Sequence, residues 1–349
     1  MSILYVADQG VYLKKDGNRI LVEKGRTTIQ WVHAFKVEQI VLMGNIFISP
    51  GTIAFLLQEG IDTVFMSIYG KYRGRLISAF GKNIELRRAQ FKKFEDEKIK
   101  LETAKKYIQG KITNCRILLR RYNQEMNDPE VTSALHQLRI LVNQISDVAS
   151  IDSLMGIEGK SAAVYFGCFG KLLKVDDIQF NGRNRRPPKD PVNVLLSLGY
   201  SLLANTIQTQ VNVVGLDPYL GCLHSVEYGR ASLILDLMEE FRPVLIDSIV
   251  LKVINKKIIR ATDFYRPEDK EPAAFDFVEE GRSVKDYPIL LTHVGMKKFI
   301  MQYESRLEEK VYYALKEQTL SYRAICLEKV RMLARYLKSE EDYIPFIMR

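Results

Sequence analysis

The chain has 349 residues, of which 47% are hydrophobic and 27% charged. This length is enough for about two domains, and the composition excludes a disordered or collagen-like chain. Its 51 Lys and Arg outnumber the 42 Asp and Glu, so the formal net charge of +9 favours a polyanionic partner. The four cysteines stand too far apart for a Cys-x-x-Cys ligand pair, and the first residues lack the apolar stretch of a signal peptide. We therefore expect a cytoplasmic protein that does not enter a membrane.

Residues 1–80 have the pattern of short strands. The pair Asp16-Gly17 separates two apolar stretches, which is typical of a tight hairpin turn. The segment 37–43 predicts a further strand, and the "RGRL" that begins at Arg73 predicts the last one. A single helix between them is indicated by the Ser49-Pro50 start signal.

Residues 81–349 predict helices. Apolar side chains at Ile108, Ile112, Cys115 and Leu119 follow helical spacing. Between residues 82 and 121 the chain has 13 Lys or Arg against 5 Asp or Glu, which fits either a DNA-binding surface or a solvated helix face. The sequence "GRNRRPPK" at 182–189 predicts a mobile basic loop. The fold class is therefore α+β, with a small N-terminal β-rich domain over residues 1–80 and a larger all-helical C-terminal domain over residues 81–349.

A histidine and two acids form one candidate site. His224 lies in the turn-rich stretch "LDPYLGCLHSVEYGR", just ahead of a helix on which Asp236 and Glu239 are three residues apart and share a face. Oxygen ligands with one imidazole suit Mn²⁺ or Mg²⁺ better than zinc. The alternative is a solvated acidic helix end that pairs with Arg242. A zinc site built on Cys222 and His224 is disfavoured, because no second ligand pair follows at zinc spacing.

Glu158 is the third candidate. It lies in "GIEGKSAAVYF", where small residues allow close packing, and a buried carboxylate needs a partner. That partner is a metal ion, Lys160 or an arginine. Tyr165 lies two helical turns further along the same face, so it belongs either to the site or to the core. The chain has no nucleophile-elbow, P-loop or Rossmann motif, which argues against a serine hydrolase and a nucleotide-binding enzyme.

Four segments in a fixed order resemble one known family. They are "GIEGKSAAVYF", "DPVNVLLSLGYSLL", "GLDPYLGCLHSVEYGRASLILDLMEEFRP" and "YRAICLEKVRMLARYL". Together with the N-terminal strands they are similar to the CRISPR-associated endonuclease-integrases of spacer adaptation, over nearly the whole chain. The resemblance implies a role in antiviral defence: a metal-dependent DNA endonuclease and integrase that inserts short duplex DNA into the CRISPR array by 3′-hydroxyl transesterification.

The resemblance also implies partners. Family members form homodimers, with dimerisation and DNA contacts in the N-terminal β domain. Two dimers join a small ferredoxin-like second subunit in a hetero-hexamer, and the assembly binds double-stranded and branched DNA. No membrane is involved.

The family's site residues carry over to particular positions. Glu158, His224 and Glu239 match the catalytic residues that bind one Mg²⁺ or Mn²⁺ ion. The third ligand is often Asp in relatives and is Glu here, so Asp236 stays a further candidate ligand. The side chains expected to contact DNA are Arg75, Arg87, Arg88, Lys92, Lys93, Tyr165, Arg183, Arg185, Arg186, Tyr200 and Arg242.

Two other functions remain open from the sequence. One is a general nuclease that acts on branched DNA in repair, and the other is a non-catalytic DNA-binding scaffold, which the basic residues between 82 and 121 would support. Dependence of activity on a divalent metal and on Glu158 distinguishes the two enzymes from the scaffold.

Overall fold

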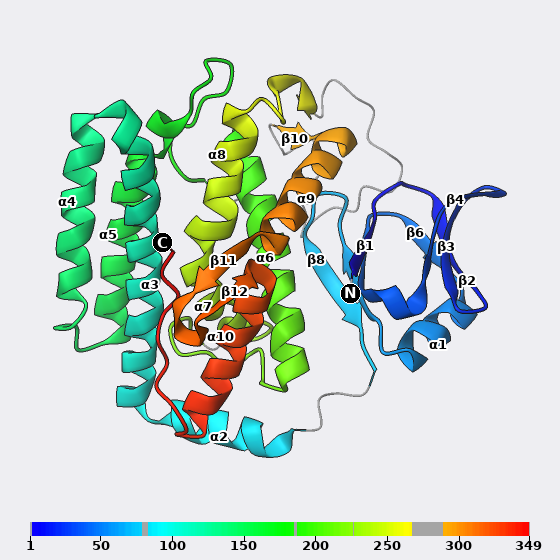
Figure 1. The fold of residues 1–349 in the computed structure, drawn as a ribbon, viewed down its shortest axis with the longest axis horizontal. Coiled ribbons are helices and arrows are strands. Elements are labelled where there is room, and N and C mark those ends of the chain that lie inside the picture. The colour runs from blue at the N-terminus through cyan, green and yellow to red at the C-terminus, as the bar shows by residue number, and fades with distance from the viewer. Residues whose placement is uncertain (1, 79–82, 185–186, 226, 267–288, 349) are drawn as a thin grey trace. The chain divides into compact units, whose positions relative to one another are not determined.

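The computed structural model describes residues 2–78, 83–184, 187–225, 227–266 and 289–348. The chain divides into two compact units, Met1–Phe80 with Tyr265–Lys297, and Gly81–Phe264 with Lys298–Arg349. N-terminal strands are followed by a mostly helical region (Figure 1), as the α+β class predicts. The first unit includes the segment Tyr265–Lys297 in addition to the predicted residues 1–80.

The first unit contains two four-stranded sheets, in the orders β1-β5-β7-β8 and β4-β3-β2-β6. The strands are β1 Ser2–Val6, β2 Val11–Asp16, β3 Arg19–Lys24, β4 Thr27–His33, β5 Val37–Met43, β6 Ile46–Ile48, β7 Asp62–Met66 and β8 Tyr72–Leu76. The predicted hairpin is confirmed: β2 and β3 pair antiparallel from Asp16 opposite Arg19, and Gly17 has the positive φ of +55° that the tight turn needs.

The core of this unit is supplied by alternate strand residues and one helix. Val11 and Leu13 of β2 are buried between exposed neighbours, as expected for a sheet with one face covered. Helix α1 (Pro50–Gln58) packs Phe55 and Leu56 into the same core. Its start is as predicted, because the Ser49 hydroxyl accepts a hydrogen bond from the Thr52 N–H at 3.2 Å.

The second unit is mostly helical rather than all-helical. Its longer helices are α2 Ile84–Glu95, α3 Glu97–Met126, α4 Pro129–Gln144, α5 Ile151–Phe169, α6 Pro191–Val214, α7 Ser232–Met238, α8 Ser248–Asn255 and α10 Tyr322–Leu337, and most of α9 His293–Glu308 also belongs to it. The prediction missed the antiparallel hairpin of β11 (Lys310–Tyr313) and β12 (Gln318–Ser321), which joins α9 to α10. The remaining short elements of the described chain are η1 Ala34–Lys36, η2 Gly170–Leu172, η3 Glu239–Phe241, η4 Arg242–Asp247, η5 Ala261–Asp263, η8 Ala314–Lys316, β9 Phe264–Tyr265 and β10 Leu290–Leu291.

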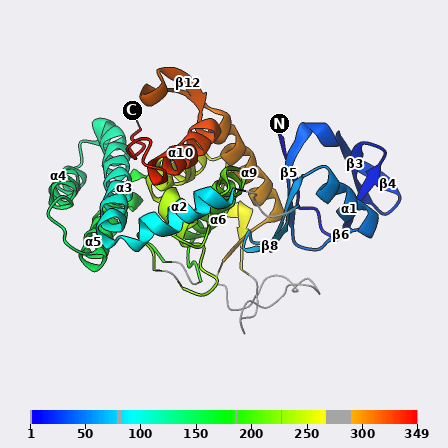
Figure 2. The same cartoon turned by 90° about the horizontal axis from the view of Figure 1, so that it is seen from below.

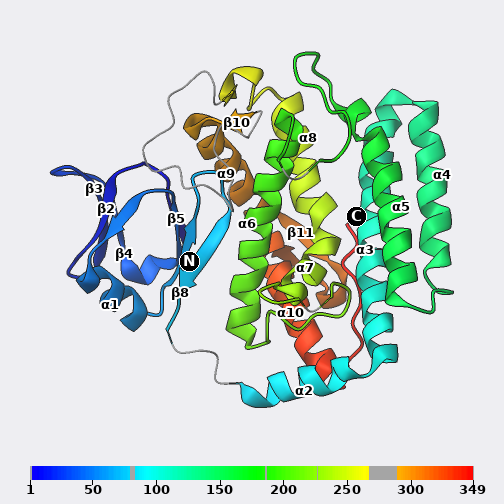
Figure 3. The same ribbon diagram turned by 180° about the vertical axis from the view of Figure 1, so that it is seen from behind.

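Helix α3 is the central element of the second unit. It lies beside α4 and α5 on one side (Figures 1 and 3). It is separated from α2 at Asp96, whose carboxylate caps α3 by accepting the N–H groups of Lys98 at 2.9 Å and Ile99 at 3.1 Å. The predicted apolar seam is confirmed, since Ile108, Ile112, Cys115 and Leu119 are buried.

Helix α10 packs against α6 and α2 (Figure 2). Helix α6 starts as expected at Asp190-Pro191, where the Asp190 carboxylate accepts the Asn193 N–H at 2.9 Å. After α10 the chain turns back and its last residues lie against α3, with the Met348 N–H 2.9 Å from Oδ1 of Asn114 (Figure 1). No helix among the described residues combines the length and hydropathy that a membrane span requires.

Candidate active site

The candidate site is assembled from five segments of the second unit. Lys111 comes from α3 and Glu158 from α5. His224 comes from the loop ahead of α7, Glu239 from the 3₁₀ turn η3 (Glu239–Phe241), and Arg242 from the following π-helical turn η4 (Arg242–Asp247). The site therefore depends on tertiary packing rather than on one local motif.

The chain after α7 does not continue as a regular helix. Pro243 stands in the first turn of η4 and has no N–H to offer an α-helical ladder, and the backbone tightens at Glu239 and widens from Arg242. Such π-helical turns are frequent at functional sites. The sequence predicted Asp236 and Glu239 on one helix face, whereas the structure places Asp236 in α7 and Glu239 in the tighter turn.

Lys111 lies between the two carboxylates of the site. Its Nζ contacts Oε1 of Glu158 and is 2.7 Å from Oε2 of Glu239. The side chains of Lys111, Glu158 and Glu239 are only 10%, 19% and 4% exposed, so solvent screens these ion pairs weakly. One ammonium group thus links α3, α5 and η3.

Arg242 supplies the second positive charge. Its Nη2 is 3.1 Å from Oε1 of Glu239. Burial raises the pKa of Glu239, but the charges of Arg242 and Lys111 outweigh burial and bring that pKa down to about 2. Burial alone would lower the pKa of Lys111. The negative charges of Glu239 and Glu158 outweigh burial, so this pKa is raised above its usual value. At neutral pH Glu239 is therefore a carboxylate held between two cations.

Asp236 organises the loop that carries His224. Its carboxylate accepts the N–H groups of Cys222 at 2.6 Å, Leu223 at 3.0 Å and His224 at 3.0 Å. Gly221 leaves room for this carboxylate, since a Cβ at that position would lie 2.5 Å from Oδ2 of Asp236. The close packing of loop against helix therefore requires glycine there.

Asp236 also orients the imidazole of His224. Nδ1 of His224 is 2.7 Å from Oδ1 of Asp236, and Nε2 is 4.0 Å from Oε1 of Glu239. Because the carboxylate of Asp236 accepts hydrogen bonds, Nδ1 of His224 donates to it, and Nε2 faces Glu239. Both oxygens of Asp236 are already in use.

The donors at this site have the chemistry of a divalent-metal centre. Two carboxylates and one imidazole nitrogen meet here, and the buried Oε2 of Glu239 makes no aligned hydrogen bond although it contacts Lys111. The residue types therefore fit Mg²⁺ or Mn²⁺. Within the described part of the chain, however, no three His, Cys, Asp or Glu side chains are close enough together to hold an ion. Lys111 stands between two of the three predicted ligands.

Next to these residues, two tyrosines bind a buried aspartate. Tyr165 donates to Oδ2 of Asp247 at 2.9 Å, and Tyr200 donates to Oδ1 at 2.6 Å. The guanidinium of Arg242 lies 4.8 Å from the centre of the Tyr200 ring. Tyr165 is only 1% exposed, so it offers no surface to DNA, and its predicted DNA contact gives way to a core hydrogen bond.

Two other arginines predicted to contact DNA are held by side chains of the protein itself. Arg75 lies in the first unit and points inward: its side chain is 5% exposed and its Nη2 is 2.8 Å from Oδ2 of Asp62. Arg183 is also anchored, with Nη1 2.7 Å from Oδ1 of Asn193. In the predicted mobile basic loop, Arg185 and Arg186 lie outside the described residues.

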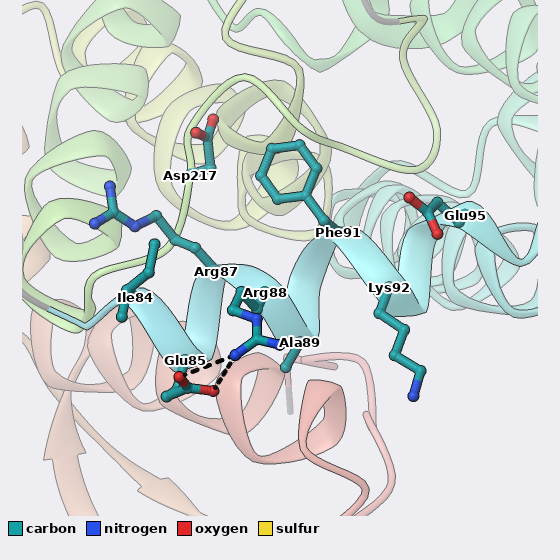
Figure 4. Close-up of a pocket in the computed structure, with 9 residues that line it drawn as sticks. All are labelled: Ile84, Glu85, Arg87, Arg88, Ala89, Phe91, Lys92, Glu95 and Asp217. Atoms are coloured by element: carbon teal, nitrogen blue, oxygen red, sulfur yellow. Dashed lines mark hydrogen bonds and ion pairs between the residues drawn. The ribbon is translucent and has the colours of Figure 1, made fainter.

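The basic side chains of α2 line a surface groove of about 620 Å³ (Figure 4). Arg87, Arg88 and Lys92 lie along it together with the exposed ring of Phe91. Arg88 pairs with Glu85 at 3.2 Å on the exposed side of the helix. Lys93 is turned away from the groove toward α10, where its Nζ donates to Oγ of Ser339 at 2.9 Å.

Sequence reasoning missed two residues of the site. Lys111 was counted among the basic surface residues, yet it follows Ile108 by three positions and precedes Cys115 by four, which puts it on the apolar seam of α3. Asp247 is a single acid within the apolar run "VLIDSIVL", a second signal of a buried charge.

Comparison with known proteins agrees with the fold and with the order of the segments. The family model described as "CRISPR associated protein Cas1" matches residues 4–305. The CRISPR-associated endonuclease Cas1 3 of Thermus thermophilus is 36% identical over 352 aligned residues, which cover 100% of this chain and 98% of that protein. The chain therefore belongs to the CRISPR-associated Cas1 family.

Two solved structures share the fold. A casposase bound to an integration product superimposes with a TM-score of 0.82 at 24% identity, over 99% of this chain and 93% of the other. A Cas1 protein from Thermotoga maritima gives a TM-score of 0.79 at 23% identity over the full length of both chains. The strand-rich N-terminal part and the mostly helical remainder are thus common to these proteins.

Proposed function

We propose that this chain is a metal-dependent DNA endonuclease and integrase of CRISPR adaptation, which inserts short duplex DNA into the CRISPR array. The observation that carries the proposal is that Glu158 and Glu239 meet at the buried ammonium of Lys111 while Nε2 of His224 lies 4.0 Å from Glu239, with the three residues supplied by separate segments of the chain. The name of the Thermus thermophilus relative, an endonuclease, supports the nuclease activity. The casposase with its integration product supports the integrase activity.

Glu158, His224 and Glu239 would hold one Mg²⁺ or Mn²⁺ ion, through two carboxylates and Nε2 of the imidazole. When bound, such an ion supplies Lewis acidity to a phosphoryl group and to the 3′ oxygen that leaves it. Asp236 keeps the proton of His224 on Nδ1, which reserves Nε2 for the ion. This arrangement favours Glu239 over Asp236 as the third ligand.

The remaining residues bind and orient DNA. Arg242 stacks on Tyr200 and contacts Glu239, so it presents a fixed positive charge to a phosphate that enters the site. The attacking group is the 3′-hydroxyl of the incoming strand, and a phosphodiester bond of the target is exchanged for a new one with release of the target's own 3′ oxygen. No covalent bond to the protein is required.

The assembly we propose is a homodimer that joins a small ferredoxin-like subunit in a hetero-hexamer on duplex or branched DNA, in the cytoplasm. A feature of the first unit supports self-association. The outer face of the β4-β3-β2-β6 sheet exposes Tyr12, Trp31 and Phe47, and the rings of Tyr12 and Phe47 stack at 4.7 Å. Exposed aromatic side chains gathered on one face are typical of protein interfaces, and we assign this face to a second copy of the chain.

An integration reaction tests the proposal. The purified protein is incubated with the product of the neighbouring gene, labelled short duplex DNA and a supercoiled plasmid that carries repeats, with Mn²⁺ or Mg²⁺. We expect label to become joined to the plasmid, and both EDTA and Glu158→Gln to abolish the joining. DNA binding without any metal-dependent joining or cleavage would support the scaffold function instead. Cleavage of branched DNA without joining would support the repair nuclease.

A further inference from the structure

We propose that Lys111 is a built-in counter-ion of the metal centre: its ammonium holds Glu158 and Glu239 together in the metal-free protein and leaves that position when a divalent ion binds. This inference rests on the proposed function, because it concerns the same ligands. It adds a competitor that belongs to the protein itself and that sets how tightly the metal is held.

The first argument is positional. The Nζ of Lys111 contacts Glu158 and lies 2.7 Å from Glu239, so it fills the space between the two carboxylates. A divalent ion needs carboxylate oxygens at about 2.0–2.2 Å, closer than an ammonium approaches them. The same oxygens cannot serve both cations.

The second argument is charge. Glu158 and Glu239 carry two negative charges, and Lys111 and Arg242 carry two positive charges that face them. These four charges therefore balance one another in the metal-free site, and the carboxylate of Asp236 adds one negative charge on the other side of His224. A divalent ion that entered with both cations in place would leave uncompensated positive charge in a site that is almost closed to solvent, where repulsion is weakly screened.

Of the two cations, Lys111 is the one that can move. Arg242 is held by its ion pair with Glu239 and by the face of the Tyr200 ring. Lys111 instead presents a compact ammonium on a flexible four-carbon stem. Removal of this ammonium from between the carboxylates frees the contacting oxygen of each of them at the same time.

The backbone beneath Lys111 is fixed, so the movement belongs to the side chain alone. Gly110 packs so closely that an added Cβ would lie 3.1 Å from Cβ of Glu240 and 3.0 Å from Pro345. Asn114, one turn further on, donates from Nδ2 to the carbonyl oxygens of Glu240 and Phe346, at 2.8 Å each. These contacts lock α3 against η3 and the C-terminal segment.

Mn²⁺ binding to the Lys111→Met variant tests the inference. Without the ammonium, Mn²⁺ no longer competes for the carboxylates, and we expect at least tenfold tighter binding by calorimetry, equivalent to about 1.4 kcal/mol. In EDTA the same variant should unfold at a lower temperature than the wild type, because the two carboxylates lose the cation between them and repel each other. Mn²⁺ should raise the melting temperature of the variant by more than it raises that of the wild type. Lys98→Met, an exposed position in the first turn of α3, is the matched control and should leave all three values unchanged.

Unchanged or weaker Mn²⁺ binding by folded Lys111→Met would overturn the inference. Should that variant not fold, amine labelling of the wild type replaces it. Reductive methylation followed by mass spectrometry should modify Lys111 at least about threefold faster, relative to Lys98, with Mn²⁺ than with EDTA. An equal ratio in the two conditions would overturn the inference as well.

The same binding measurement separates this inference from the proposed function. If wild type and Glu158→Gln bind Mn²⁺ equally, the metal site itself is misplaced and both fail. If Glu158→Gln abolishes binding while Lys111→Met binds like the wild type, the metal site stands and only the role of Lys111 is wrong.

Discussion

Two acids three residues apart, Asp236 and Glu239, have different environments at the scale of single residues. Asp236 is surrounded by N–H donors of the His224 loop, whereas Glu239 faces Lys111 and Arg242. The first environment suits a positioning group and the second suits the proposed metal ligand, because the ammonium of Lys111 can be displaced whereas backbone amides cannot. The difference arises from the change of backbone geometry at residue 239.

Substitutions at these two acids should therefore have different effects. Glu239→Ala and His224→Ala should lose strand joining and high-affinity Mn²⁺ binding while they keep the fold. Asp236→Asn should weaken Mn²⁺ binding by about 10–100-fold, the usual effect of losing a group that orients a ligand. Calorimetric titration with Mn²⁺ and circular dichroism provide the measurements. Activity in Glu239→Ala together with none in Asp236→Ala would show that the third ligand is Asp236.

Asp247 should make stability depend on pH in an identifiable way. Burial raises its pKa to about 6, although hydrogen bonds from Tyr200 and Tyr165 act to lower it. Its pKa is about 3.9 when unfolded, so between about pH 4 and 6 the folded chain binds more protons and its free energy of unfolding falls as pH rises. Above that window the cost is complete, at about 3 kcal/mol.

Asp247→Asn removes this titration. The free energy of unfolding of the variant minus that of the wild type should increase by about 3 kcal/mol from pH 4 to pH 7 in urea denaturation. Asp152→Asn, at an exposed position in the first turn of α5, is the control and should show no such increase. A pH-independent difference for Asp247→Asn would mean that Asp247 has no raised pKa.

At the scale of elements, the segment that follows α10 packs against the candidate site. Tyr343 donates to Oε1 of Glu240 at 2.5 Å, and the Phe346 N–H donates to its Oε2. The buried ammonium of Lys329 lies 3.8 Å from the same carboxylate. Glu240 adjoins Glu239 in η3, so this segment fixes the turn that carries the proposed metal ligand.

Tyr343→Phe should reveal this coupling. The variant leaves a buried carboxylate oxygen without its hydroxyl donor, which should lower the free energy of unfolding by about 1–3 kcal/mol. Mn²⁺ binding should weaken with it, because η3 loses a fixed neighbour. Tyr219→Phe, at an exposed position, is the control in the same denaturation and titration experiments. Full Mn²⁺ affinity in a destabilised Tyr343→Phe would confine the segment to a stabilising role.

The basic face of α2 makes a separate prediction about DNA. Charge reversal at Arg87, Arg88 and Lys92, which line the groove in Figure 4, should reduce the slope of log affinity against log salt by about 0.9 for each phosphate that the protein no longer neutralises. Reversal of the exposed Lys256 and Lys310 is the control. An unchanged slope in the α2 variant would assign its charges to a solvated face.

Elements whose structure is set by neighbouring residues could be predicted from the sequence, whereas elements that depend on contacts between distant segments could not. The hairpin at Gly17 and the cap at Ser49 are set by two or three neighbouring residues, and both are confirmed. The turn at residue 239 and the docking of Tyr343 depend on contacts between segments more than 100 residues apart in sequence, and no local pattern encodes them. The charge of Lys111 suggested an exposed side chain, whereas its spacing from Ile108 and Cys115 placed it on the buried face of the helix.

At the scale of the whole molecule, some basic residues are exposed to solvent and others are buried at the candidate site. The basic surplus of residues 82–121 accounts for most of the net charge of +9, and it includes exposed residues of α2 as well as the buried Lys111. Exposed charges govern how DNA is captured, because they release counter-ions, whereas buried charges govern what happens to one phosphate. Binding and catalysis should therefore respond independently to changes on the DNA.

A dideoxy end on the incoming strand separates them. It removes the 3′ oxygen that we propose as the attacking group and leaves every phosphate that contributes to affinity. DNA binding should stay within about twofold of normal, while joining of labelled DNA to the plasmid falls to background. A hydrolytic nuclease takes its nucleophile from water, so its cleavage of the plasmid would continue and its products would carry no label.

If joining persisted with dideoxy ends, a protein side chain would have to form the covalent intermediate. Tyr200, whose hydroxyl is 2.6 Å from Asp247 and whose ring lies beside Arg242, would then be the first residue to replace with phenylalanine.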